Sequence, residues 1–272
     1  MKHTITMKHI FSKQNKALLS ELVRTDFKLR YQGSVLGYAW SLLRPLLLFI
    51  ILYVVFVKFL RIGNGVPNYP IYLLLGIVLW NFFAEMTSQG LSAIVGRGDL
   101  IRKIRIPRWM IIVSTSISAL INLTLNMVVV IVIAIIGGMH FLTSSVFLPL
   151  FLLEIYLFAL GITLFLSALF VKYRDVSYIW EVCLQAGFYI TPVIYPLSLI
   201  KNVNVQKLIL MNPLGQAVQD ARNVFVTHAT ITNSEVFHNQ FIRIIPISIV
   251  ILVLILGVWY FKKHAKSFAE DL

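Results

Sequence analysis

A run of positive charge in a mostly apolar sequence is the first feature that could carry chemistry. The stretch GRGDLIRKIRIPRW, residues 96–109, places five Lys and Arg residues in fourteen positions. Such a cluster can bind nucleic acid, a phosphate group, a membrane surface or a partner protein. Apolar anchors alternate with its charges at Leu100, Ile101, Ile104 and Ile106. Which of these partners applies depends on where the rest of the chain places the run.

Residues 17–31 carry a second group of charges. Their apolar residues recur at helical spacing, with the charged residues mainly on the other face. This pattern predicts a helix that lies in the membrane interface, either as a simple anchor or as a gate where Lys28 and Arg30 meet an anionic substrate head. Arg44, beside Pro45, either reaches back to the lipid headgroups or faces a polar cavity and helps bind a phosphate.

The sequence contains no set of residues with the spacing of a catalytic or metal site. The dipeptide Gly-Lys never occurs, so the nucleotide-binding loop G-x-x-x-x-G-K-[ST] has no match, and the six histidines show no ligand spacing. Cys183 is the single cysteine, which excludes a disulfide within the chain. Glu85, Glu154 and Glu181 fall within apolar runs, where they serve either packing or proton transfer. The chain is therefore not expected to be an enzyme.

The composition indicates which elements must position these residues. Hydrophobic residues make up 58% of the chain and charged residues 13%, against about 45–50% and about 25% in soluble domains. This is the composition of an integral membrane protein. About 20 apolar residues cross a bilayer as a helix, and six segments qualify. They lie at about 40–60, 69–91, 110–138, 148–171, 176–195 and 242–261.

The distribution of Lys and Arg predicts the orientation of these spans. With six spans, one side holds residues 1–39, the basic run 96–109, the 172–174 connection and the C-terminal tail. Seventeen of the 24 Lys and Arg residues fall on that side and six on the other. The excess places both termini and the basic run in the cytoplasm. Most of the positive charge thus reports topology, and nucleic acid is not an expected partner.

The fifth predicted span is short. From Val176 to Pro192 about 16 residues can be helical, roughly 24 Å at 1.5 Å per residue, and Pro192 and Pro196 should end or bend the helix. Further on, Asn212 is a suitable N-cap and Pro213 a suitable first residue for another helix. These features predict a partly re-entrant external cap rather than a soluble loop.

Aromatic residues recur at helical spacing on the first two spans. They are Phe49, Tyr53 and Phe56 on the first, and Trp80 and Phe83 on the second. Tyr38 and Trp40 precede the first span as interface aromatics. These rings serve either ordinary helix packing or a smooth lining along which sugar rings slide.

Several segments resemble one family in the same order along nearly the whole chain. They are LVRTDFKLRYQGSVLGYAWSLLRPLLLFIILYVVF, GRGDLIRKIRIPRW, VKYRDVSYIWEVCLQAGFYITPVIYP and NPLGQAVQDARNVF. Together they resemble ABC transporter permeases that export polysaccharides, the O-antigen and teichoic-acid exporters.

The resemblance implies an all-α integral membrane protein with six transmembrane helices. An N-terminal interfacial amphipathic helix would act as a gate, a cytoplasmic coupling helix would join spans two and three, and re-entrant periplasmic helices would follow span five. A single permease domain would cover residues 1–272. It would comprise a cytoplasmic or interfacial segment over 1–35, the six-span region over 36–262 and a cytoplasmic tail over 263–272.

The same resemblance implies the partners. The permease would form a homodimer in the bacterial inner membrane and recruit two copies of a separate ATPase, which binds ATP and Mg, so this chain needs no cofactor. The cargo would be a long polysaccharide linked through pyrophosphate to a polyprenol lipid.

Four groups of site residues are expected. Coupling to the ATPase is assigned to Asp99, Leu100, Ile101, Arg102, Lys103, Ile104 and Arg105. The cytoplasmic gate and pyrophosphate site is assigned to Lys28, Arg30, Tyr31 and Arg44. The glycan pathway is assigned to Tyr38, Trp40, Phe49, Tyr53, Phe56, Trp80 and Phe83. The periplasmic gate is assigned to Pro192, Tyr195, Pro196, Asn212 and Pro213.

Two other functions stay open for a chain of this composition. A secondary transporter would be driven by protons through Glu85, Glu154 or Glu181. A membrane transferase would act on lipid-linked sugars, although no convergent acid/base pair is evident on the loops. The identity of the glycan is not predicted.

Overall fold

The chain folds into helices throughout the part that the structure describes. A computed structural model places residues 13–31, 34, 36–37, 39–63, 65–103, 106–265 and 268, and no strand occurs among them. In chain order the longer elements are α2 (Lys13–Tyr31), α3 (Ala39–Leu52), the π-helical η1 (Tyr53–Phe59), α4 (Tyr69–Ala93), α5 (Gly98–Lys103), α6 (Trp109–Ile136), α7 (Leu148–Lys172), α8 (Val176–Ile190), α9 (Val203–Met211), α10 (Pro213–Phe225), α11 (Asn233–Phe237) and α12 (Ile244–His264). Short 3₁₀ turns are η2 (Val95–Arg97), η3 (Thr143–Phe147), η4 (Leu197–Leu199) and η5 (Gln240–Arg243).

Among the residues that the structure describes, five helical segments are long and apolar enough to cross a membrane. They are Ala39–Phe59, Tyr69–Ala93, Trp109–Ile136, Thr143–Lys172 and Phe241–His264. Each overlaps a span predicted from the sequence, so these five predictions are confirmed as apolar helices of spanning length.

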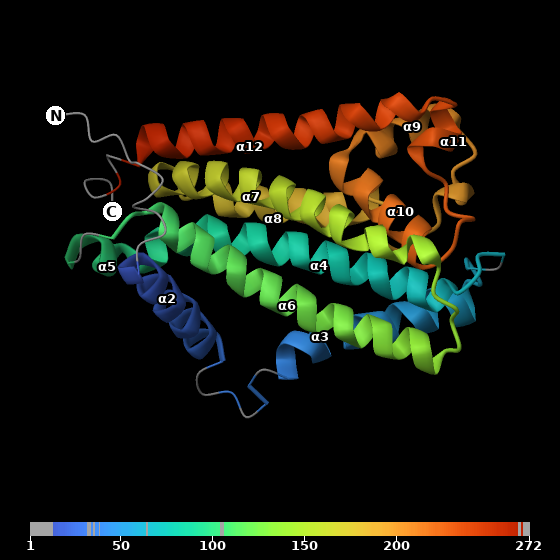
Figure 1. Cartoon of the computed structure of the whole chain (residues 1–272), viewed down its shortest axis with the longest axis horizontal. Coiled ribbons are helices and arrows are strands. Elements are labelled where there is room, and N and C mark those ends of the chain that lie inside the picture. The colour runs from blue at the N-terminus through green and yellow to red at the C-terminus, as the bar shows by residue number, and fades with distance from the viewer. Residues whose placement is uncertain are drawn as a thin grey trace.

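The fifth predicted span is a shorter helix, as expected. α8 has fifteen residues, about 22 Å at 1.5 Å per residue, and it ends before Pro192. The chain must still pass from the end of α7 to the opposite end of the bundle, where α12 begins, and α8 makes most of that passage (Figure 1). Six crossings and re-entrant helices stay predictions.

The helices form an elongated bundle around α4. In the most apolar 18-residue stretch of α4, 78% of the residues are buried, whereas only 6% are buried in the corresponding stretch of the span formed by α3 and η1. Figure 1 shows α5 and the start of α6 at one end of the bundle, here called the α5 end, and α9, α10 and α11 at the other, here called the cap end. The main apolar core joins α4 to α6, α7, α8 and α10. The α5 end and the cap end of the bundle are therefore connected through one central helix, α4.

Two glycines allow α7 and α12 to touch along their backbones. A Cβ on Gly257 would lie 2.1 Å from the carbonyl oxygen of Gly161, and a Cβ on Gly161 would lie 2.8 Å from the Leu254 backbone. Small residues at such a crossing are typical of membrane helices, because close approach maximises dispersion contacts.

Replacing Gly257 with alanine is expected to separate α7 from α12 locally and destabilise the protein. Overpacking of this kind costs about 1–3 kcal/mol, which should lower the midpoint of thermal unfolding in detergent. Gly96→Ala is the control, since a Cβ at Gly96 meets nothing within 4 Å. Equal midpoints for the two variants would contradict the crossing.

Candidate functional site

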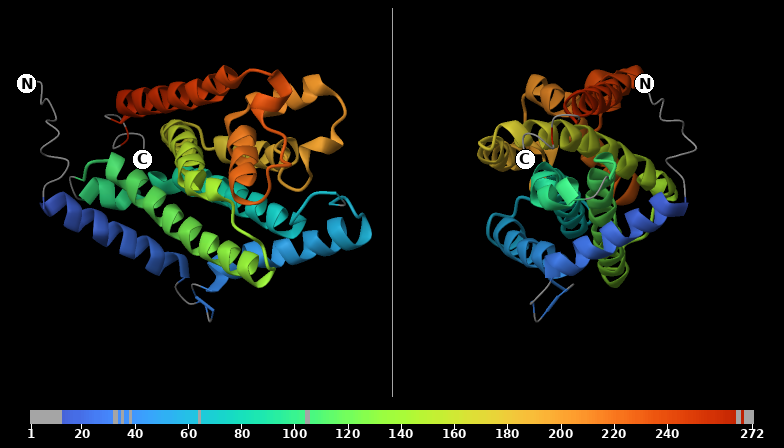
Figure 2. Two further views of the ribbon diagram at one scale, coloured as in Figure 1. Left: turned by 45° about the vertical axis from the view of Figure 1, so that its right-hand side comes forward. Right: turned by 90° about the vertical axis from the view of Figure 1, so that its left-hand side faces the viewer.

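At the α5 end, α2 is held against the protein by apolar side chains. Leu22, Ile106 and Met110 form a small buried cluster, to which Leu18, Leu100 and Trp109 add partly buried contacts. α2 thereby lies along the first part of α6 (Figure 2). The apolar face predicted for residues 17–31 thus meets protein at least at Leu18 and Leu22.

An ion pair joins α2 to the segment before α5. Asp26 of α2 contacts Arg97 of η2, and the two side chains are only 13% and 20% exposed. Arg97 Nη1 also donates to Ser114 Oγ at 3.2 Å and to the Ile111 carbonyl at 3.4 Å on α6. Burial lowers the pKa of Arg97. One guanidinium therefore links three elements beside α5.

α5 itself is a single short helix at the tip of the bundle (Figure 1). Asp99 lies in its first turn, where a negative charge suits the helix dipole. Leu100 packs toward the Leu22 cluster, and Ile101 packs toward a second cluster that includes Phe261. The predicted coupling residues that lie outside the description are Ile104 and Arg105, together with the side chains of Arg102 and Lys103.

Breaking the Asp26–Arg97 pair should loosen α2. We expect Arg97→Asp to cost about 1–3 kcal/mol, less than a fully buried pair because both groups keep some water contact. Exchanging the charges in Asp26→Arg/Arg97→Asp should recover part of the loss in thermal unfolding of the detergent-solubilised protein, a coupling that a double-mutant cycle measures. Arg24→Asp, on the exposed face of α2, is the control. No recovery in the exchanged variant would contradict a specific pair.

The residues predicted for the cytoplasmic gate lie in different surroundings. Lys28 is exposed on α2, whereas the side chains of Arg30 and Tyr31 lie outside the description, as does Tyr38 of the predicted glycan pathway. Arg44 on α3 lines a cavity of about 520 Å³ between α3, α4 and α6. Arg44 is also exposed, so both interpretations of this residue stay predictions.

At the cap end, α10 begins as the sequence predicted. The Asn212 side chain accepts a hydrogen bond from the Leu214 amide at 3.1 Å, and Pro213 is the first helical residue. One apolar side of this helix is buried. Its members are Leu214, Ala217, Val218, Ala221 and Phe225. α10 is thus part of the core and not a surface loop.

Arg222 of α10 is the central residue of the cap end, and the sequence reasoning missed it. Its side chain is fully buried, and its Nε donates to the Tyr72 carbonyl at 3.0 Å. Nη2 donates to the Val193 carbonyl at 2.6 Å, and Nη1 donates to the Pro192 carbonyl and to Gln219 Oε1. The guanidinium also stacks 3.7 Å from the centre of the Tyr72 ring. Arg222 therefore fastens α10 to α4 and to the broken end of α8.

Two tyrosines complete this junction. The Tyr195 hydroxyl donates to the carbonyls of Tyr189 and Ile190 at 3.0 and 3.3 Å, and the Tyr69 hydroxyl donates to the Ile194 carbonyl at 2.7 Å. Carbonyls at the end of α8 and just beyond it, which have no helical donor, thus accept hydrogen bonds from side chains. Pro192 and Tyr195, predicted for the external gate, lie in the segment between α8 and η4, and Pro196 is the N-cap of η4. Their role in a gate stays a prediction.

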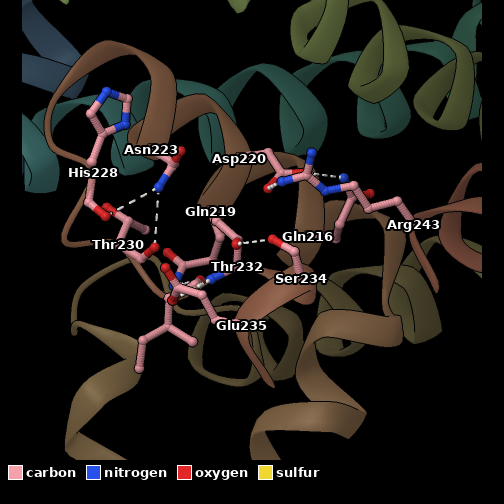
Figure 3. Close-up of polar contacts among 11 residues, drawn as sticks. Gln216, Gln219, Asp220, Asn223, His228, Thr230, Thr232, Ser234, Glu235 and Arg243 are labelled. Carbon is pink, nitrogen blue, oxygen red and sulfur yellow. Dashed lines mark hydrogen bonds and ion pairs between the residues drawn. The ribbon is translucent and has the colours of Figure 1, made fainter. Parts of the chain in front are cut away.

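The polar side chains of α10 form a largely buried network with the segment that follows the helix (Figure 3). Gln216 Nε2 donates to Asp220 Oδ2 at 2.5 Å, and Arg243 contacts Asp220 Oδ1 at 3.4 Å. Burial raises the pKa of Asp220. Asn223 donates to the carbonyls of His228 and Thr230. The connection between α10 and α12 is therefore tied to α10 and not loose.

The predicted glycan-pathway aromatics divide into two sets. Trp80 and Phe83 are only 6% and 5% exposed. Their rings pack against Phe188 and Phe158, each with centroids 5.8 Å apart. The packing interpretation thus describes these two residues in this conformation. On the first span, Phe49, Tyr53 and Phe56 are half-buried and Trp40 is 46% exposed.

The sequence of this helical bundle matches a known transporter family. The profile of the ABC-2 type transporters covers residues 17–226, from α2 to the end of α10. The chain belongs to the ABC-2 type transporter family. It is 32% identical to the O-antigen export system permease protein RfbA of Myxococcus xanthus over 79% of this chain and 82% of that protein. It is 28% identical to the Klebsiella pneumoniae protein of the same name over 94% of this chain and 95% of that protein.

Membership in this family agrees with two predictions from the sequence. The resemblance to ABC permeases is confirmed, and the relatives are named as permeases and not as enzymes. The matched range of this ABC-2 type transporter includes both the Asp26–Arg97 pair at the α5 end and the contacts of Arg222 at the cap end. A signal for Arg222 existed: Leu214, Val218 and Arg222 follow at intervals of four, so they share one helix face.

Proposed function

We propose that this chain is the membrane subunit of an ATP-driven exporter that moves polyprenyl-pyrophosphate-linked polysaccharide of the O-antigen type out of the cytoplasm across the inner membrane. The similarity to O-antigen export permeases over 94% of the chain carries this proposal. Such end-to-end similarity includes α2, α5 and the cap, so the likeness is not confined to generic apolar spans.

The energy would come from a separate ATPase, because this sequence has no phosphate-binding loop. α5 is the proposed contact, since it lies at the tip of the bundle and its apolar residues bind it to α2, α6 and α12. A push on α5 would pass through Arg97 to α2, the proposed gate. Both termini and α5 would be cytoplasmic.

Two copies would form the transporter. The α3 span is largely unburied within one chain, and α8 leaves Tyr178, Val182 and Tyr189 exposed by 72%, 64% and 66%. These apolar faces are available to lipid and to a second copy. The glycan would pass between the copies beside α3, and the Pro192–Tyr195 junction would close the periplasmic side.

Export by the complete system tests the proposal. Cells lacking this gene should accumulate lipid-linked polysaccharide inside and regain it at the cell surface when the chain is expressed with its ATPase. An ATPase carrying an alanine at its phosphate-binding lysine should fail to restore export. Export that persists without any ATPase and stops on Glu85→Gln would instead support a proton-driven transporter, and sugar transfer by the purified chain alone would support a transferase.

A further inference from the structure

A polar stripe interrupts the otherwise apolar surface of α4. Asn81, Glu85, Ser88 and Gln89 recur at helical spacing, on the one side of this central helix that is not fully buried. Polar residues inside a membrane bundle are expensive and face protein partners or a cavity. The stripe therefore needs a polar neighbour, and the structure provides a cavity.

The cavity of about 520 Å³ lies against this stripe. Asn122 and Asn126 of α6 face it from one side, and Trp40 and Arg44 of α3 line it from another. Arg44 and Glu85 supply its full charges among the described lining residues. The volume is within the range of small-ligand sites, about 300–1,000 Å³.

One buried atom in this lining has no partner. Asn122 is 2% exposed, and its Nδ2 donates to Glu85 Oε1 at 2.6 Å. Its other side-chain atom, Oδ1, has no hydrogen-bond partner in the described part of the chain. A buried acceptor without a donor is costly, and a donor from a molecule in the cavity would remove that cost.

The chemistry of the lining selects the kind of molecule. Amides, hydroxyls and a carboxylate together offer donors and acceptors to several hydroxyl groups, while Trp40 and Phe82 add apolar surface for a ring. Arg44 is exposed, and a guanidinium binds phosphate oxygens through paired charge-assisted bonds. This set of groups fits a sugar ring that carries a phosphate.

We infer that this cavity binds the glycosyl-pyrophosphate head of the lipid-linked cargo, with the sugar donating a hydroxyl hydrogen to Asn122 Oδ1 and the phosphate at Arg44. The inference rests on the proposed function and adds to it a docking site within the protomer. An ordinary phospholipid shares the phosphate but lacks the sugar ring, so the two sources are separable.

Protection of an introduced cysteine tests the site. Cys183 is exposed and is first replaced with serine; Ser88→Cys then reports on the cavity, and Ser198→Cys, exposed in η4 outside the five apolar segments, reports on the surface. Farnesyl-pyrophosphoryl-N-acetylglucosamine should slow maleimide labelling of Ser88→Cys but not of Ser198→Cys. Protection by farnesyl pyrophosphate or by phosphatidylglycerol vesicles to the same degree would overturn the inference, as would no protection.

Two variants connect the protection to the named groups. Asn122→Leu and Arg44→Gln should each raise the probe concentration for half-protection about tenfold, the loss expected for one hydrogen bond to a buried or charged group. Ser116→Ala is the control, since Ser116 is buried on α6 but contacts Tyr156 of α7. Unchanged protection in Arg44→Gln, whose exposed position spares the fold, would overturn the phosphate assignment. If the cavity fails these tests while the wild type still exports polysaccharide, the proposed function stands without this site.

Discussion

Replacing Arg222 with methionine is expected to detach the cap from the bundle and abolish export. The guanidinium satisfies the carbonyls of Tyr72, Pro192 and Val193, and all three lose their donor in the variant. Each buried carbonyl left without a donor costs ~1–3 kcal/mol, so the total loss should be about 3 kcal/mol or more. This is a large share of the stability of most proteins.

Lysine should not restore this junction. Its ammonium is a single charged point, whereas the planar guanidinium both spreads its donors over three segments and stacks on Tyr72. Gly76 leaves the space that the guanidinium occupies, because a Cβ at position 76 would lie 2.0 Å from Arg222 Nη2. The pocket is therefore shaped around this one side chain.

The measurement is thermal unfolding of the detergent-solubilised protein, followed by fluorescence size-exclusion, together with surface polysaccharide in cells. Arg243→Met is the matched control, since the Arg243 side chain is 41% exposed. Arg222→Met should unfold at a clearly lower temperature than Arg243→Met. If the two variants unfold together and both export, Arg222 does not fasten the cap.

The features that could be predicted from the sequence are those determined by neighbours along the chain. Prolines shortened the fifth helix whatever packs around it, because Pro192 and Pro196 remove amide donors. Asn212 and Pro213 set the start of α10 for the same local reason. Apolar length alone located the five long helices.

The features that could not be predicted depend on residues far apart in the chain. The donor and acceptor of the Arg222–Tyr72 bond are 150 positions apart, and no pattern within one helix specifies that distance. The same holds for Glu85, which was considered for proton transfer; its bond to Asn122 spans 37 positions. The polar stripe on α4 was visible in the sequence, but only the packing of α3 and α6 makes it one side of a cavity.

The second large effect is expected at α5. Reversing charge in Arg102→Glu/Lys103→Glu/Arg105→Glu should abolish export while the protein still inserts and folds. These positions lie on or directly after α5, whose apolar residues Leu100 and Ile101 bind it to the bundle. Since the fold depends on those apolar contacts, removing the cations should weaken only the proposed contact with the ATPase. Surface polysaccharide and co-purification of the ATPase are the measurements.

A loss of export could also follow from disturbed membrane topology, because cytoplasmic Lys and Arg orient the spans. Lys172→Glu/Lys262→Glu/Lys263→Glu separates the two causes: it makes the same charge change at exposed positions of the same end of the bundle but leaves α5 intact. We expect this control to export and to retain the ATPase. If both triple variants lose export equally, the basic run serves topology alone; if the α5 variant exports normally, α5 is not the coupling element. Only a defect confined to the α5 variant makes the basic run the point where ATP hydrolysis in another subunit moves this one.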